Sequence, residues 1–107
     1  MATITFTSAG AIEATSFKAN SSRKVKREIN PTLISALDII NSTDIVDFKY
    51  IEDFDDTPHV GFIAEDTDPL LSTPDKNGMD YTNCIGTLMK AVQELSKKVD
   101  LLEEKIK

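Results

Sequence analysis

The last 26 residues of the chain carry its most constraining feature, a heptad repeat of apolar side chains. The members are separated alternately by three and four residues: Ile85, Leu88, Val92, Leu95, Val99, Leu102 and Ile106. This spacing places them on one stripe of an α-helix, at the a and d positions of a coiled coil, and we call it the a/d stripe. An isolated helix of this length is only marginally stable in water, so the stripe predicts partner helices.

The residues beside the a/d stripe leave the number of partner helices open. Lys98 lies at a g position and Glu103 at the following e position, which predicts an ion pair between chains of a parallel coil. β-branched residues at a with leucine at d favour two strands, but the spacing alone leaves both a dimer and a trimer open. A helix packed on its own domain also has an apolar stripe. The strict heptad spacing favours self-association.

The composition is that of one small globular domain. The chain has 107 residues, of which 40% are hydrophobic and 28% charged. Cys84 is the single cysteine, so an intrachain disulfide is excluded. No apolar run approaches the roughly 20 residues that span a bilayer, and no membrane partner is expected. The first residues lack the basic and apolar regions of a signal peptide.

The net charge of −6 is unevenly distributed along the chain. Residues 1–37 carry five basic and two acidic side chains, whereas residues 38–81 carry two basic and twelve acidic ones. So acidic a middle segment argues against nucleic acid as a partner. It predicts instead an attraction between the basic start and the acidic centre of the same or a neighbouring chain.

The first 20 residues are small and rich in β-forming side chains. Ile4 and Phe6 lie on one face of an alternating strand, and Ile12 and Phe17 follow after a break at residues 8–10. This is too little apolar surface to fold alone. The segment therefore reads as the end of a longer β-structured shaft, with a frayed N-terminal arm as the alternative.

Residues 21–81 are predicted to form a compact α+β head. Asn30 and Pro31 suit the N-cap and the first position of a helix, and Ile29 and Ile34 suit a hydrophobic staple, so we expect a helix from there to residues 41–42. Alternating β-branched and aromatic residues predict strands at 45–51 and 59–64, joined by a polar turn at 53–58. Asn77-Gly78 predicts a later turn.

A serine pair followed by a basic cluster is the segment most suited to chemistry. Ser21 and Ser22 precede Arg23, Lys24, Lys26 and Arg27. A short basic run is a weak indication of nucleic-acid binding, because such runs are usually just solvated. A serine hydroxyl becomes a nucleophile when a base takes its proton, and a lysine serves as that base when burial or nearby cations lower its pKa. The spacing alone does not distinguish this pairing from chance.

Three segments together resemble a known family. Ser21 to Ile29 resembles the S-D-x-R-x-K-x-x-I signature of the peptidase S74 family, the intramolecular chaperone auto-processing domains at the ends of phage endosialidases, tail spikes, tail fibres and neck appendages. His59 to Glu65 resembles that family's H-V-G-F-I-A-Q-E stretch, and Asp80 to Lys107 resembles its closing helical segment. The three segments occur in the family's order.

The resemblance implies a homotrimer in which a small head and a long helix from each chain hold three upstream shafts together. It implies that Ser21 is the nucleophile, Lys26 its general base and Asn20–Ser21 the scissile bond. Residues 1–20 would be the end of the upstream fibre and residues 21–107 the chaperone domain, with a globular part at 21–81 and a coiled coil at 82–107. The precursor of a virion appendage would be made in the host cytoplasm, and the released domain would be absent from the mature virion.

Several alternatives remain open at this point. Ser22 stands where the family has aspartate, and Lys24 where it has arginine, so Ser22 is a second candidate nucleophile. His59, the only histidine, is either an accessory site residue or a hydrogen-bonded strand residue. The acidic turn at 53–58 lacks the glycine and terminal glutamate of an EF-hand, and neither a metal nor a cofactor is expected. A structural trimerisation tip that never cuts, and a receptor-binding tip, are the alternative functions.

Overall fold

The computed structural model describes residues 4–8 and 10–107 and divides the chain into two units. Unit 1 comprises the residues up to Pro31 together with Tyr50–Thr57. Unit 2 comprises Thr32–Lys49 and Pro58–Lys107.

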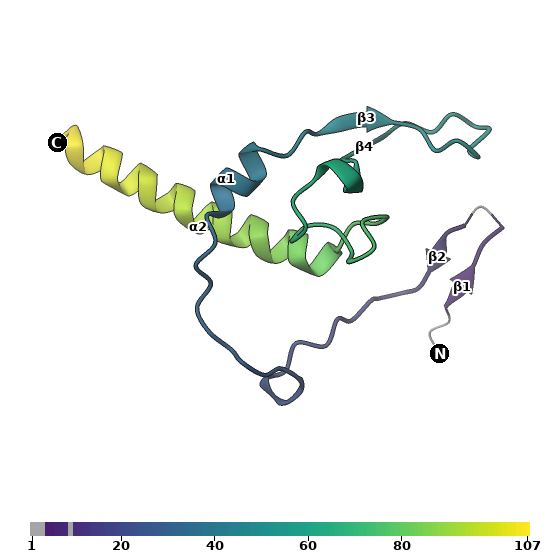
Figure 1. The fold of residues 1–107 in the computed structure, drawn as a ribbon, viewed down its shortest axis with the longest axis horizontal. Coiled ribbons are helices and arrows are strands. Elements are labelled where there is room, and N and C mark those ends of the chain that lie inside the picture. Colours follow the sequence, from purple (N-terminus) through teal and green to yellow (C-terminus); the bar gives the residue numbers. More distant parts are fainter. Residues whose placement is uncertain (1–3, 9) are drawn as a thin grey trace. The chain divides into compact units, whose positions relative to one another are not determined.

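Unit 1 begins with a small β-hairpin (Figure 1). Strand β1 (Thr5–Phe6) pairs antiparallel with β2 (Ile12–Glu13), and Phe6 lies opposite Ile12. In the turn, Gly10 has a φ of +83°, a conformation that glycine adopts at little cost. The β prediction for this segment is thereby confirmed within the described residues. Residues 1–3, and Ala9 of the predicted break, lie outside them.

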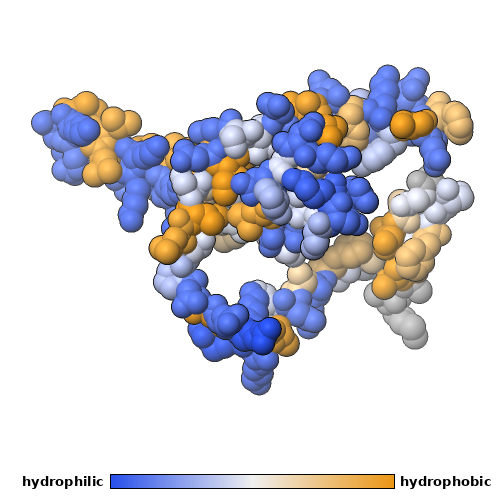
Figure 2. Space-filling model, viewed as in Figure 1, coloured by the Kyte–Doolittle hydropathy of each residue, from blue (hydrophilic) through white to orange (hydrophobic). Residues whose placement is uncertain are grey.

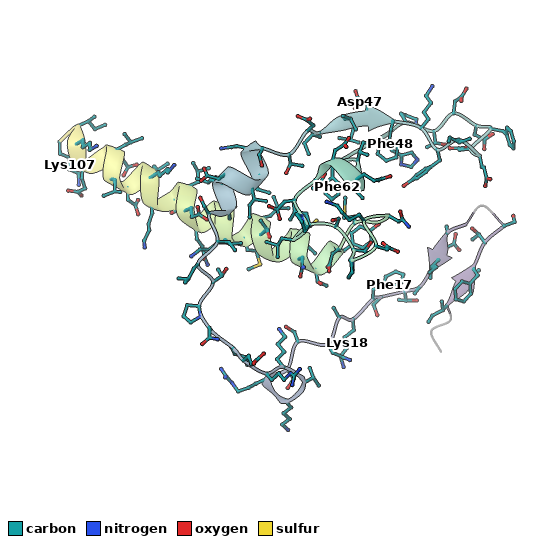
Figure 3. All side chains as sticks on the ribbon, in the orientation of Figure 1. Phe17, Lys18, Asp47, Phe48, Phe62 and Lys107 are labelled. Atoms are coloured by element: carbon teal, nitrogen blue, oxygen red, sulfur yellow. The ribbon has the colours of Figure 1, made fainter. Side chains whose placement is uncertain are left out.

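The remainder of unit 1 is extended and has little secondary structure. The ribbon that carries Phe17 and Lys18 leads without regular structure into η1, a 3₁₀ turn at Arg23–Val25 (Figure 3). Every residue from 15 to 31 is exposed to solvent. At 53–57 the Asp53 carboxylate accepts the backbone N–H groups of Asp55 and Thr57, which confirms the predicted polar turn. Since apolar burial is the main stabilising term in folding, this extended part of unit 1 draws little stability from its own packing.

The longest element of unit 2 is helix α2 (Tyr81–Lys105), which confirms the helix predicted from the heptad repeat (Figure 1). Asp80 is its N-cap, and its Oδ1 accepts the backbone N–H of Asn83 at 3.0 Å. The Asn83 side chain donates to the backbone oxygen of Leu70 at 2.9 Å. The start of α2 is therefore fixed both by its own cap and by the preceding loop.

Helix α1 (Ala36–Asn41) begins five residues later than the sequence predicts. The predicted N-cap at Asn30 is wrong: its side chain donates to the backbone oxygen of Glu28 at 3.2 Å instead. The Thr32 hydroxyl accepts the N–H of Ile34, which holds the backbone there in a local turn. The predicted helix end at residues 41–42 is confirmed.

Two short strands form the sheet of unit 2. Strand β3 (Val46–Phe48) pairs antiparallel with β4 (His59–Gly61), within the two predicted strand segments. The rings of Phe48 and His59 stack with centroids 5.4 Å apart. A Cβ on Gly61 would lie 3.2 Å from the Phe48 ring, so glycine lets this ring lie against β4. A 3₁₀ turn, η2 (Ala64–Asp66), follows.

The loop before α2 is closed by an isolated bridge between Ser72 and Met79. The predicted turn is present, with Thr73 N–H bonded to Gly78 O at 2.9 Å. Within this turn, Lys76 has a left-handed backbone conformation, with a φ of +57°. Its ammonium donates to the backbone oxygen of Thr67 at 3.0 Å. Among the described residues, the buried apolar side chains are small apart from one leucine: Ala36, Ala64, Leu71 and Ala91.

Candidate functional site

The side chains of Ser21 and Lys26 meet in unit 1. The Lys26 ammonium donates to Ser21 Oγ, with 2.6 Å between Nζ and Oγ. Both residues are exposed in this single chain. Ser21 provides the nitrogen of the Asn20–Ser21 peptide bond, so this hydroxyl is on the residue directly after that bond. The two residues that the resemblance assigns as nucleophile and base are therefore within hydrogen-bond distance of each other.

The 3₁₀ turn η1 brings these two side chains together. Val25 N–H donates to Ser22 O at 3.1 Å, and Lys26 N–H donates to Arg23 O at 3.3 Å. Ser22 is the N-cap of the turn, and its Oγ accepts the N–H of Lys24 at 3.1 Å. Serine and aspartate are both favoured N-cap residues, so Ser22 provides the cap that an aspartate at this position would provide.

A contact of this length between an amine and a hydroxyl permits proton transfer. A neutral lysine amine can take the hydroxyl proton, and the resulting alkoxide is the nucleophile of covalent catalysis. An ammonium group instead only donates to the hydroxyl. The arrangement can therefore support serine-type acyl transfer once the lysine has lost a proton.

His59 lies in unit 2, on β4. It is partly buried, and its ring stacks on Phe48 with an angle of 19° between the ring planes. Ser22 is occupied as the cap of η1. The accessory roles considered for Ser22 and His59 remain predictions.

The a/d stripe of α2 is exposed, and a different face of the helix packs against the rest of unit 2. Exposure along the stripe ranges from 45% at Val99 to 84% at Ile106. The packed face consists of small or polar residues, Cys84, Thr87, Ala91 and Glu94, and contacts α1 and the loop before α2. Figure 2 shows hydrophobic atoms at the surface along α2. Helix α2 thus packs on unit 2 with one face and leaves the a/d stripe exposed.

Glu94 links the two helices of unit 2 and was missed at the sequence level. Its carboxylate accepts the backbone N–H groups of Ala36 at 2.8 Å and Leu37 at 3.4 Å. These are free amides of the first turn of α1, where a negative charge is favourable. Ser35, the residue at the N-cap position, makes no cap bond. The sequence indicates this contact only through the small residues Cys84, Thr87 and Ala91, which precede Glu94 at helical spacings of three and four.

Cys84 lies on the packed face near the start of α2. Its thiol contacts the backbone oxygen of Leu71 at 3.5 Å. Burial raises the pKa of the Cys84 thiol, and the nearby Asp80 carboxylate raises it further. A raised pKa leaves less of the nucleophilic thiolate at neutral pH, so this thiol is packed rather than activated.

Within residues 4–8 and 10–107, no three His, Cys, Asp or Glu side chains are grouped to hold a metal ion. None of the helices described there is long and apolar enough to cross a membrane.

Comparison with known protein families finds a match to part of the chain. Residues 21–73, about half of the chain, match a family model named peptidase S74 and described as the chaperone of endosialidase. The match confirms the resemblance and covers the Ser21–Lys26 pair and the His59 strand. It ends before α2, so the resemblance of the closing segment rests on the residues quoted above. Neither the curated proteins nor the solved structures contain a match.

Proposed function

From the placement of residues 21–73 in the peptidase S74 family, chaperone of endosialidase, we propose that this chain is the C-terminal intramolecular chaperone of a phage tail or appendage protein. It promotes homotrimerisation and folding of the fibre that precedes it. It then releases itself by a single autoproteolytic cut at Asn20–Ser21. The observation that carries the proposal is the 2.6 Å contact between Lys26 Nζ and Ser21 Oγ beside that bond.

The cut proceeds by acyl transfer from nitrogen to oxygen. The neutral Lys26 amine takes the Ser21 hydroxyl proton as Oγ attacks the carbonyl carbon of Asn20. The carbon–nitrogen bond then breaks, and the Lys26 ammonium returns the proton to the departing nitrogen of Ser21. An ester now joins Asn20 to Ser21 Oγ. One water molecule hydrolyses it, which leaves a carboxylate on Asn20 and a free amine and hydroxyl on Ser21.

The trimer supplies what the single chain lacks. A lysine loses its proton more readily when it is removed from water, and both members of the pair are exposed in one chain. Burial of the pair against neighbouring copies would favour the neutral amine. Cutting would then follow assembly rather than precede it.

The exposed a/d stripe supports self-association through α2. Residues 95–107 are exposed throughout and form the free end of the helix, too short to persist alone in water. Parallel pairing with other copies would bury the stripe and bring Lys98 of one chain toward Glu103 of the next. The partners are therefore other copies of this chain and the upstream fibre domain, in a virion appendage precursor made in the host cytoplasm. The released domain would be absent from the mature virion.

A second candidate is a trimerisation tip that stays attached to its fibre. The exposure of Ser21 and Lys26 favours it, because the single chain provides no burial that would favour the neutral amine. In that case the Lys26–Ser21 contact is an ordinary surface hydrogen bond.

Intact-mass and native-mass spectrometry of the full chain separate the two candidates. The proposal expects a trimer that loses residues 1–20 in wild type and remains whole in Ser21→Ala and Lys26→Ala. Ser22→Ala is expected to cut still, and at the same bond. A trimer that stays whole in every sample would support the tip, and a cut that persists in Ser21→Ala would overturn the assigned nucleophile.

A further inference from the structure

We propose that Ser22 is a positioning residue, which holds Lys26 on Ser21 by capping the 3₁₀ turn η1. The inference rests on the proposed self-cleavage and assigns the second serine of the pair a role different from the first. Ser22 has extended backbone angles, φ −67° and ψ 145°, as an N-cap residue does. Its Oγ accepts the N–H of Lys24 at 3.1 Å.

The turn that Ser22 caps is stabilised by few interactions. It contains three residues, Arg23–Val25, and none of them is buried. Apart from the cap, two backbone bonds close it, from Val25 N–H to Ser22 O and from Lys26 N–H to Arg23 O. Side-chain packing therefore contributes little to the stability of the turn. The cap is one of three hydrogen bonds within the turn, and the Lys26–Ser21 contact spans it as a fourth.

The turn is what allows Lys26 to reach Ser21. The two residues are five positions apart, and in an extended chain their Cα atoms would be separated by roughly 17 Å. In the structure Nζ and Oγ are 2.6 Å apart. Lys26 directly follows η1 as its C-cap and already has extended angles, φ −118° and ψ 152°. Opening the turn would therefore separate base from nucleophile without altering either side chain.

The two serines thus have separate roles. Ser21 Oγ contacts the Lys26 amine, whereas Ser22 Oγ contacts a backbone amide. Residues that cap as serine does, such as asparagine, aspartate and threonine, should replace Ser22 but not Ser21. Alanine at 22 removes the cap and retains the nucleophile.

The test is a time course of cutting in the full chain, synthesised without cells and sampled by intact-mass spectrometry. Ser22→Ala is expected to slow the cut about three- to thirtyfold, the range that follows from loss of an N-cap. Ser22→Asn and Ser22→Asp are expected to restore the rate to within about threefold. Ser16→Ala is the matched control, since Ser16 is an exposed serine of the same unit, and it should cut as wild type does.

The pH profile separates a positioning role of Ser22 from a part in the proton transfer itself. Because Ser22 acts on the population of the turn and not on the proton of Lys26, the Ser22→Ala rate should fall by one factor across the pH range, with the midpoint unchanged. A Ser22→Ala rate equal to wild type would overturn the proposal. So would a slowed rate that neither asparagine nor aspartate restores.

An NMR measurement separates failure of this inference from failure of the proposed function. A nuclear Overhauser contact between the Lys26 ε-protons and the Ser21 β-protons should be present in the uncut full chain, lost in Ser22→Ala and restored in Ser22→Asn. If this pattern holds while wild type never cuts, Ser22 positions the pair and the self-cleavage proposal is wrong. If the contact is unchanged in Ser22→Ala, the positioning role is wrong whether or not the chain cuts.

Discussion

Lys26 Nζ and Ser21 Oγ lie 2.6 Å apart in the structure, five residues from each other along an exposed segment. The first prediction concerns the nature of this contact. Lys26→Arg keeps a cationic donor beside the hydroxyl but removes any group that can take a proton, because arginine stays protonated in proteins. We expect no cut at Asn20–Ser21 in this variant by intact-mass spectrometry over several days. Lys24→Arg is the control and should cut normally, and a wild-type rate in Lys26→Arg would mean that Lys26 is not the base.

The second prediction concerns Glu94, which caps α1 from α2. Glu94→Ala leaves the amides of Ala36 and Leu37 without their carboxylate, so we expect the free energy of unfolding to fall by about 1–3 kcal/mol. Glu94→Gln keeps a hydrogen-bond acceptor without the charge, so its free energy of unfolding should fall by less. Urea unfolding followed by circular dichroism at one fixed protein concentration measures both. Lys97→Ala replaces an exposed residue of the same helix, and its free energy of unfolding should lie within about 0.5 kcal/mol of the wild-type value. A Glu94→Ala protein as stable as wild type would contradict the capping role of Glu94.

The third prediction uses two adjacent leucines with similar exposure in the single chain. Leu102 is a member of the a/d stripe and is 60% exposed, whereas Leu101 lies outside the stripe, at a c position, and is 63% exposed. Burying one leucine contributes about 1.5–3 kcal/mol, so Leu102→Asp in three copies should weaken trimer association at least about a thousandfold. Leu101→Asp should leave assembly unchanged. Analytical ultracentrifugation distinguishes the two variants, and equal behaviour would contradict association through the a/d stripe.

The fourth prediction concerns the pH dependence of Cys84. Burial and Asp80 raise the pKa of its thiol, so the reactive thiolate is scarcer at pH 8 than in the unfolded chain. Alkylation by iodoacetamide should be slower in the folded protein than in urea and should accelerate as the pH rises through the raised pKa. Asp80→Asn keeps a capping side chain and removes the charge, so it should react faster than wild type at the same pH. Equal rates for these two proteins would exclude an effect of Asp80.

Ionising the same thiol also opposes folding. A group whose pKa is raised in the folded state stabilises the fold below its unfolded pKa and loses that contribution as the pH rises through the folded pKa. We therefore expect stability to decline on the alkaline side in wild type and to decline less in Cys84→Ala. Unfolding curves at several alkaline pH values would show this, and parallel declines in the two proteins would contradict it.

Local patterns were sufficient to predict the elements whose stabilising contacts are local. The heptad repeat predicts α2, and alternating residues predict β3 and β4, since in each case the relevant side chains lie within one element. The start of α1 could not be found in this way, because the carboxylate that binds its first amides comes from Glu94, far along the chain. Asn30 and Pro31 form a good helix-start pattern, and the long-range contact overrides it.

The candidate site shows the same division between local and non-local information. Spacing alone did not single out Ser21 and Lys26; the resemblance did, and the structure places their side chains in contact. The capping role of Ser22 depends on the 3₁₀ turn, which the sequence analysis did not predict. The packed face of α2 was also missed, because its small residues contribute little to an apolar pattern beside the larger members of the a/d stripe.

The contact between Glu94 and the first turn of α1 also sets an order of events during synthesis. Ala36 leaves the site of peptide-bond formation 58 residues before Glu94 does. At about 5–20 residues per second this interval lasts roughly 3–12 s, during which the amides of α1 have only water as a partner. Any shaft translated ahead of this domain would already be outside the ribosome. The packing of α1 against α2 can therefore be completed only after Glu94 has been synthesised.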